Sequence, residues 1–112
     1  MSSLRITDAT VDVLESLLGA DEPSWGLAVV KHSGRPAGTV YPVLERLERA
    51  GWLESEWETD TDRPGPRRRL YRLTDTGRTA ASRAIAHRVA SRRATSAVRA
   101  ASGVAHPGGG LA

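Results

Sequence analysis

Cysteine and phenylalanine are absent from this chain of 112 residues, and its aromatic side chains are limited to three tryptophans and two tyrosines. The lack of thiols excludes disulfide scaffolds and thiolate metal sites, and it is typical of a reducing cytoplasm. The lack of Phe predicts a small core of Leu, Val and Ala. A domain of this size often gains stability by pairing with a second copy.

Long apolar runs and catalytic signatures are also missing. No apolar stretch approaches the roughly 20 residues needed to cross a bilayer, so we expect no membrane partner. His32, His87 and His106 lack the spacing of metal ligands, and no Gly-rich phosphate loop follows a predicted strand. We therefore expect no metal, no cofactor and no enzymatic activity.

Acidic residues are scarce in the second half of the chain. Residues 1–62 hold 12 of the 13 Asp and Glu but 5 of the 16 Lys and Arg, whereas residues 63–112 hold 11 basic residues and one acid, Asp75. Such asymmetry indicates either a nucleic-acid partner or one half folding against the opposite half of another subunit.

Helical signals fill the first part of the chain. Thr7 can cap a first helix, which Gly19 would end after apolar residues recurring at helical spacing. Ser24 can cap a second, short helix over residues 25–32, which Gly34 would end. A tight connection at residues 35–38 then leads into a third helix.

The third helix contains a proline. The helix begins at Ala37 or at Thr39 and extends to Ala50, and Pro42 would distort it if it lay deep inside. We favour Thr39 as the N-cap, because Pro42 then lies in the first turn, where its missing N–H costs little. The apolar stripe of this helix consists of Val40, Val43, Leu44 and Leu47.

Beyond residue 51 the apolar period changes from that of a helix to that of a strand. Residues 53–58 and 68–73 alternate as half-exposed strands do, and the Pro- and Gly-rich stretch between them predicts a hairpin with a long tip. Thr74 or Asp75 then caps a fourth helix.

The predicted organisation has three parts. Residues 1–74 form a winged helix-turn-helix domain, mainly α with a small β-hairpin. Residues 75–102 form a long C-terminal helix of roughly 40 Å, too long for so small a body to cover. Residues 103–112 are expected to be a disordered tail.

Two linked motifs sharpen this interpretation over residues 6–80. The first is Gly38-Thr39-x-Tyr41-x-x-Leu44-x-x-Leu47-x-x-x-Gly51, and the second is Tyr71-Arg72-Leu73-Thr74-x-x-Gly77 after an acidic strand and a Pro- and Arg-rich wing tip. Together they resemble the PadR family of transcriptional regulators. Pro42 and the Trp25-Gly26-Leu27 stretch depart from the family pattern. The resemblance implies a bacterial homodimeric repressor with a C-terminal dimerisation helix.

A recognition helix enters the major groove with its N-terminal end, and arginines of a wing favour phosphates or the minor groove. The third helix, its flanks and the wing tip therefore supply the candidate DNA contacts. They are Lys31, Arg35, Gly38, Thr39, Tyr41, Pro42, Arg46, Arg49, Arg63, Arg67 and Arg68. Three alternatives stay open. Tyr41 can pack against the wing, and Arg49 can pair with Glu45 at i−4. Arg69 and Arg72 can pair across the hairpin with Glu54, Glu56 and Glu58.

The fourth helix is interpreted as the dimer arm. The candidate dimerisation residues are apolar positions of the first and fourth helices: Val11, Leu14, Leu18, Ala81, Ile85 and Val89. Arginines of the arm could meet Asp8, Asp12 and Glu15 on the first helix of the partner, grip DNA directly, or remain solvated.

The expected function is sequence-specific binding of double-stranded DNA by a homodimeric repressor at an inverted repeat, in a bacterial cytoplasm and associated with the nucleoid. A small-molecule effector at the dimer interface is a further expectation from the family resemblance. The alternative is a protein–protein interaction adaptor on the same fold, because winged helices are reused in that way.

Overall fold

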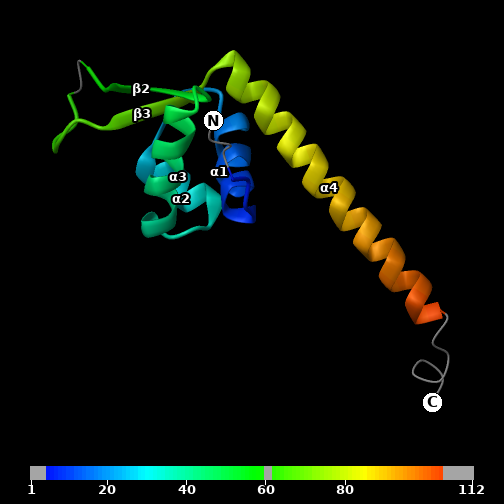
Figure 1. Cartoon of the computed structure of the whole chain (residues 1–112). Helices are drawn as coiled ribbons and strands as arrows, with labels where there is room; N and C mark the ends of the chain where they lie inside the picture. Colours follow the sequence, from blue (N-terminus) through cyan, green and yellow to red (C-terminus); the bar gives the residue numbers. More distant parts are fainter. Residues whose placement is uncertain (1–4, 60–61, 105–112) are drawn as a thin grey trace.

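Four helices and a three-stranded sheet lie within residues 5–59 and 62–104, the part of the chain that the computed structural model describes. Their order is α1 (Asp8–Leu18), β1 (Ser24–Trp25), α2 (Gly26–Ser33), α3 (Ala37–Arg49), β2 (Leu53–Trp57), β3 (Arg69–Leu73) and α4 (Asp75–Val104). The first three helices cluster, the β2–β3 wing projects to one side, and α4 runs away on the other (Figure 1). The predicted winged helix-turn-helix fold class is confirmed.

Side-chain caps and glycines set several helix ends as predicted. The Thr7 hydroxyl oxygen accepts a hydrogen bond from the backbone N–H of Thr10 at the start of α1. Gly34 ends α2 in the left-handed conformation, with φ of 73°, which glycine adopts without steric cost. The Thr74 hydroxyl accepts from the Gly77 N–H to begin α4 and donates to the Gly51 carbonyl.

The core lies where the three short helices meet the base of the wing. The predicted stripe of α3 is fully buried, and it packs on α1, α2 and both wing strands. The buried cluster consists of Val13, Leu14, Leu17, Val29, Val40, Val43, Leu44, Leu47, Leu53, Leu73 and Ala81. Small aliphatic side chains thus fill the interior, as the absence of Phe requires.

The sheet has one strand more than predicted. Ser24 and Trp25 do not cap and open a helix; they form β1, which pairs antiparallel with β3 through Ser24–Tyr71 and Trp25–Leu70. The prediction was wrong because Ser24 has the character of an N-cap, while the pairing partner lies more than 40 residues away. The β2–β3 hairpin is as predicted, with Leu53 opposite Leu73 and Glu54 opposite Arg72.

The preferred start of the third helix was also wrong. Helix α3 begins at Ala37 with Pro36 as its N-cap, so Pro42 is an interior residue of the helix. Proline has no N–H to donate to the Gly38 carbonyl one turn earlier. The helix nevertheless continues to Arg49, because four apolar side chains of its opposite face are buried.

Helix α4 leaves the body after about half its length. Ala81 is fully buried, whereas residues 89–100 are all exposed. The helix reaches Val104, two residues beyond the predicted end, and the rest of the predicted tail, residues 105–112, lies outside the described residues. None of the described helices combines the length and apolar character that a membrane span requires.

Candidate nucleic-acid interface

The outer face of α3 is the first element of the candidate interface. Gly38 is exposed, and a Cβ built on it would meet no atom within 4 Å. Thr39 is half-buried, whereas Pro42 and Arg46 are exposed. Another backbone can therefore come close to the N-terminal half of α3 at Gly38.

Tyr41 packs on α2, while the open alternative was packing on the wing. A Cβ at Gly26 would overlap the Tyr41 ring, so the ring lies directly against the backbone at the start of α2. Tyr41 is nevertheless 42% exposed, so it also faces the surface. Nearby Tyr71 has a pKa raised above the usual value, mainly because burial penalises the phenolate.

The two candidate arginines of α3 differ in their surroundings. The guanidinium of Arg49 lies 3.3 Å from the Glu45 carboxylate in an exposed i,i+4 ion pair. The Arg46 side chain has no ion-pair or hydrogen-bond partner in the described part of the chain, and it is exposed. Arg46 is therefore the freer cation on this face.

Lys31 and Arg35 flank the turn between α2 and α3. Lys31 is exposed near the end of α2. The Nε of Arg35 donates to a carboxylate oxygen of Asp12 on α1 at 2.8 Å. Desolvation raises the pKa of Asp12, but hydrogen bonds and charge from Arg88 and Arg35 outweigh it, so that the pKa lies below its usual value.

The wing arginines are largely engaged with the protein. Arg63 pairs with the Glu58 carboxylate at the tip. The Arg68 guanidinium lies 3.7 Å from the centre of the Trp25 ring, a cation–π contact, and its Nε is buried. Arg67 is exposed and has no partner among the described residues, so it is the wing cation most available to a phosphate.

The remaining strand arginines brace the wing. Arg72 lies 3.7 Å from Glu54 across the hairpin, as the cross-strand alternative predicted. Arg69 instead donates to the Ser55 hydroxyl at 2.8 Å and lies 3.9 Å from Glu48 of α3. The exposed ring of Trp57 also contacts the Arg69 guanidinium at 5.0 Å. These contacts join the wing to the helix behind it.

Arg88 of α4 pairs with acids of α1 in the same chain. Its terminal nitrogens lie 2.7 Å from Asp12 and 3.2 Å from Glu15, and its side chain is only 11% exposed. The sequence had suggested these acids for the α4 arginines of a partner subunit. Asp12 is fully engaged within the chain, because Arg35 binds its other oxygen.

The candidate dimerisation residues divide between the core and the surface. Leu14 and Ala81 are fully buried and Val11 is 4% exposed, so these three stabilise the chain itself and offer little surface to a partner. Leu18 and Ile85 are half-buried, and Val89 is 42% exposed. The sequence pattern identified the apolar side of α4 but could not separate these two groups.

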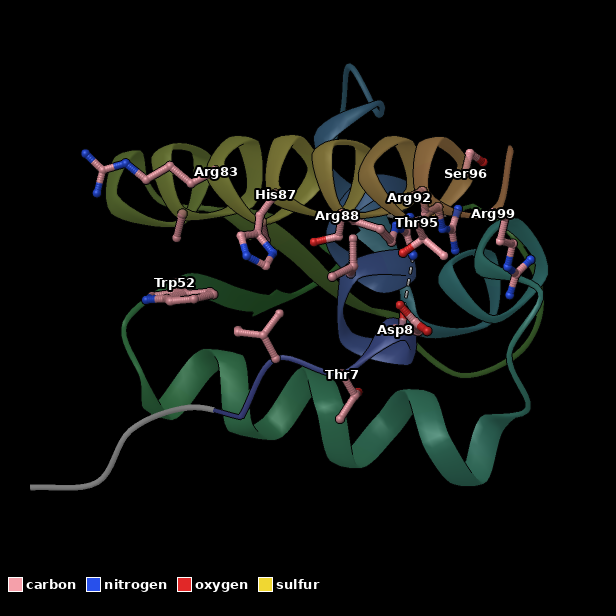
Figure 2. A pocket seen from close by; sticks show the side chains of 15 residues that line it. Thr7, Asp8, Trp52, Arg83, His87, Arg88, Arg92, Thr95, Ser96 and Arg99 are labelled. Carbon is pink, nitrogen blue, oxygen red and sulfur yellow. Dashed lines mark hydrogen bonds between the residues drawn. The ribbon is translucent and has the colours of Figure 1, made fainter. Parts of the chain in front are cut away.

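A groove of about 1090 Å³ separates the outer part of α4 from the start of α1. Trp52 lies at one end, and the side chain of His87 points from α4 into the space in front of it (Figure 2). Arg83, Arg92 and Arg99 also line the groove. Within the described residues, no group of three His, Asp or Glu side chains is placed to hold a metal ion.

Comparisons with known proteins agree with this geometry. A family model described as the transcriptional regulator PadR-like family matches residues 13–83. No curated protein matches the chain. Among solved structures, a PadR-like transcription factor from Bacteroides fragilis is 25% identical, with a TM-score of 0.59 over 81% of this chain and 91% of that one.

Two further structures share the fold. A PadR family transcription regulator from hypervirulent Clostridium difficile R20291 is 18% identical, with a TM-score of 0.69 over 82% of this chain and 98% of that chain. Bordetella bronchiseptica BpsR, whose DNA binding is regulated by 6-hydroxynicotinic acid, is 23% identical, with a TM-score of 0.67 over 85% of this chain and 68% of that chain.

The fold and the family match define a winged helix-turn-helix transcriptional regulator. More particularly, the chain belongs to the PadR-like family, since the family model covers more than half of it. Regulators of this family are transcription factors rather than enzymes.

Proposed function

We propose that this protein is a homodimeric repressor that binds double-stranded DNA at an inverted repeat. Helix α3 enters the major groove, and the β2–β3 wing lies on the adjoining backbone or minor groove. The observation that carries this proposal is the accessible N-terminal part of α3, where a Cβ on Gly38 would meet no atom within 4 Å. Further along the same helix, the exposed Arg46 side chain has no partner among the described residues. Recognition helices meet DNA with this end.

The roles of the contacts follow from their chemistry. Arg46 of α3, Lys31 of α2 and Arg67 of the wing are exposed cations that bind phosphates, and Arg46 can also reach the acceptors of a guanine. Tyr41 and Thr39 donate hydroxyl hydrogen bonds, while Pro42 offers an apolar contact to a thymine methyl.

The other candidate cations contribute less. Arg49, Arg63 and Arg68 already contact Glu45, Glu58 and Trp25, respectively. A phosphate would have to compete with the carboxylates for Arg49 and Arg63. Arg68 directly precedes β3, stacks on Trp25 and lies there as a fixed positive charge.

Dimerisation through α4 places two α3 recognition helices on one duplex. Val89 is 42% exposed, and all residues from 89 to 100 of α4 are exposed, which supports pairing along this helix. Two-fold symmetry then requires half-sites about one helical turn, roughly 34–36 Å, apart. The DNA target implies residence in the bacterial cytoplasm, at the nucleoid.

An effector would bind in the groove between α4 and α1. Its volume suits a small organic molecule, and it combines the Trp52 ring with the polar groups of His87 and Arg83. BpsR is a precedent for an aromatic acid that regulates DNA binding on this fold.

DNA selected from a random pool gives the duplex for the test. Binding should weaken steeply with salt, and Arg67→Ala should weaken all duplexes alike and lower the salt slope by about one. The matched control is Arg93→Ala, an exposed arginine of α4 outside the groove. Pro42→Ala should instead change the preferred sequence. Equal effects of the two arginine variants would contradict the role of the wing.

The adaptor function remains as a second candidate because 12 of the 13 acids lie in residues 1–62. An adaptor would bind no duplex even at low salt, and its partner protein would compete for the α3 face. The same salt titration therefore separates the two functions.

A further inference from the structure

One carboxylate, that of Asp12, joins two elements with different tasks. Its Oδ2 accepts from the Nε of Arg35 at 2.8 Å, and its Oδ1 accepts from a terminal nitrogen of Arg88 at 2.7 Å. Arg35 belongs to the turn before α3, and Arg88 belongs to α4. Each guanidinium thus occupies a different oxygen of the same group.

The bond through Nε sets the direction of Arg35. The terminal nitrogens of this side chain have no partner in the described part of the chain, and the side chain is 38% exposed. Arg35 directly precedes Pro36, the N-cap of α3. An arginine held by Nε keeps its planar terminal fork free for a second acceptor, and phosphate oxygens match that fork.

Arg88 sets the position of α4. Besides Asp12, its terminal nitrogens donate to Glu15 at 3.2 Å and to the Asp8 carbonyl at 3.4 Å, a bond drawn in Figure 2. The Arg88 side chain is 11% exposed, and its bond to Asp12 is partly buried. Helix α4 is therefore fastened to α1 next to the carboxylate that holds Arg35.

We propose that Asp12 is a positioning residue that couples the α4 arm to the DNA-facing turn, by aiming the terminal N–H groups of Arg35 at a DNA phosphate only while Arg88 occupies its other oxygen. If Arg88 withdraws, both oxygens become available to Arg35. The bidentate pair that carboxylates and guanidiniums prefer then forms, and it turns the fork of Arg35 away from the DNA. A shift of α4 thereby weakens DNA binding. This inference rests on the proposed DNA-binding function.

The direction in which DNA affinity changes when Asp12 loses its charge tests the positioning role. Removing an acid from a DNA-binding protein ordinarily strengthens binding, because repulsion of phosphates falls. Asp12→Asn is expected to weaken binding instead, by about fivefold, the lower end of coupling between sites. Glu15→Gln is the matched control. It removes the same charge from α1, at a residue that binds Arg88 but does not bind Arg35. It should leave affinity unchanged or slightly higher, and tighter binding by Asp12→Asn would overturn the proposal.

A double-mutant cycle tests the coupling. Arg88→Met should weaken DNA binding more than Arg93→Met, which removes the same charge from α4 at an exposed position. In an Arg35→Met background the additional effect of Arg88→Met should vanish, because the side chain that it redirects is gone. Measurements are made above the dimer dissociation constant and with thermal midpoints of all variants recorded. Additive effects of Arg35→Met and Arg88→Met would overturn the coupling.

A readout without DNA separates this inference from the proposed function. The Nε–H of Arg35, observed by NMR of the full chain labelled with nitrogen-15, should exchange slowly with water in the wild type and faster in Asp12→Asn. Arg88→Met should shift the signals of the terminal N–H groups of Arg35 toward those of a paired guanidinium. If the wild type binds no duplex, the proposed function fails while these signals still test the coupling. Unchanged Arg35 signals in both variants would overturn the coupling itself.

Discussion

The winged-helix body and the outer half of α4 are stabilised in different ways. In the body, Leu14, Leu44 and Leu47 are completely buried, and wing, turn and helices are joined by ion pairs. In α4, every residue from 89 to 100 is exposed. One region is held by its own core, while residues 89–100 of the other include no buried side chain.

The difference shows how one sequence supports both a folded domain and an unpartnered arm. The outer arm is rich in alanine and arginine, which rank among the strongest helix formers, so that local propensity favours the helix. Propensity alone leaves a short isolated helix marginal in water. A second copy that covers Val89 would supply the missing packing, as the proposed dimer requires.

The largest expected effect is a loss of stability when a side chain of the core is shortened, compared with the same kind of change in α4. Leu44→Ala should lower the free energy of unfolding by about 2–5 kcal/mol, because it removes buried methyl groups and leaves a cavity. Val98→Ala in the arm, where the side chain is 66% exposed, should change it by less than about 0.5 kcal/mol. Urea unfolding measures both. Similar losses would mean that the arm is as tightly packed as the body.

A smaller effect is expected where the body meets α4. A Cβ on Gly77 would overlap the backbone carbonyl of Trp52, so Gly77→Ala should cost about 1–3 kcal/mol of stability. Gly38→Ala is the control, because the space around Gly38 is open and alanine favours a helix by about 0.5–1 kcal/mol. Thermal unfolding should move in opposite directions for the two variants, while Gly38→Ala should weaken DNA binding.

The proposed dimer predicts a further difference, between two exposed valines of α4. Val89→Glu should weaken dimerisation at least about tenfold, or about 1.4 kcal/mol, because it introduces a charge into the covered face of the arm. Val98→Glu, which makes the same change outside the candidate dimerisation residues, serves as the control. Sedimentation equilibrium gives the dimer constants. Equal constants for both variants would assign the interface to another surface.

The smallest effect concerns surface charge. Glu45→Ala removes the exposed ion pair with Arg49 and should change stability by only about 0.3–0.5 kcal/mol. By freeing Arg49 and removing an acid from α3, it should nevertheless tighten DNA binding. Unfolding and a DNA titration on the same sample give both values, and weaker DNA binding would place Arg49 outside the interface.

Much of the fold could be predicted from local signals. The Thr7 cap, the stop at Gly34 and the buried stripe of α3 were all expected and are observed. Pro42 misled the prediction, because its usual place in a first turn shifted the expected start of α3. Burial of the opposite face tolerates the missing hydrogen bond there, which local propensity does not reveal.

The candidate site was less accessible to prediction. Its residues were named by type and position, and the partners of Arg49 within its helix and of Arg72 within the hairpin were among the alternatives, but partners beyond the same helix or hairpin were not predicted within the chain. Arg67 and Arg68 are neighbours of one type, yet one is exposed and the other stacks on Trp25, because β1 brings that ring to the wing. Leu14 and Ala81 likewise have apolar character that suits an interface or a core equally.

The sequence by itself determined most of the periodic elements, the caps at Thr7 and Thr74 and the concentration of acids in one half, since each depends on residues close together in the chain. Only the tertiary structure decided which charges are free. Asp12 receives Arg35 from 23 positions away and Arg88 from 76 positions away, and no local period encodes that meeting. The physical reason is that ion pairs form between groups that the packing of α1, α3 and α4 brings together.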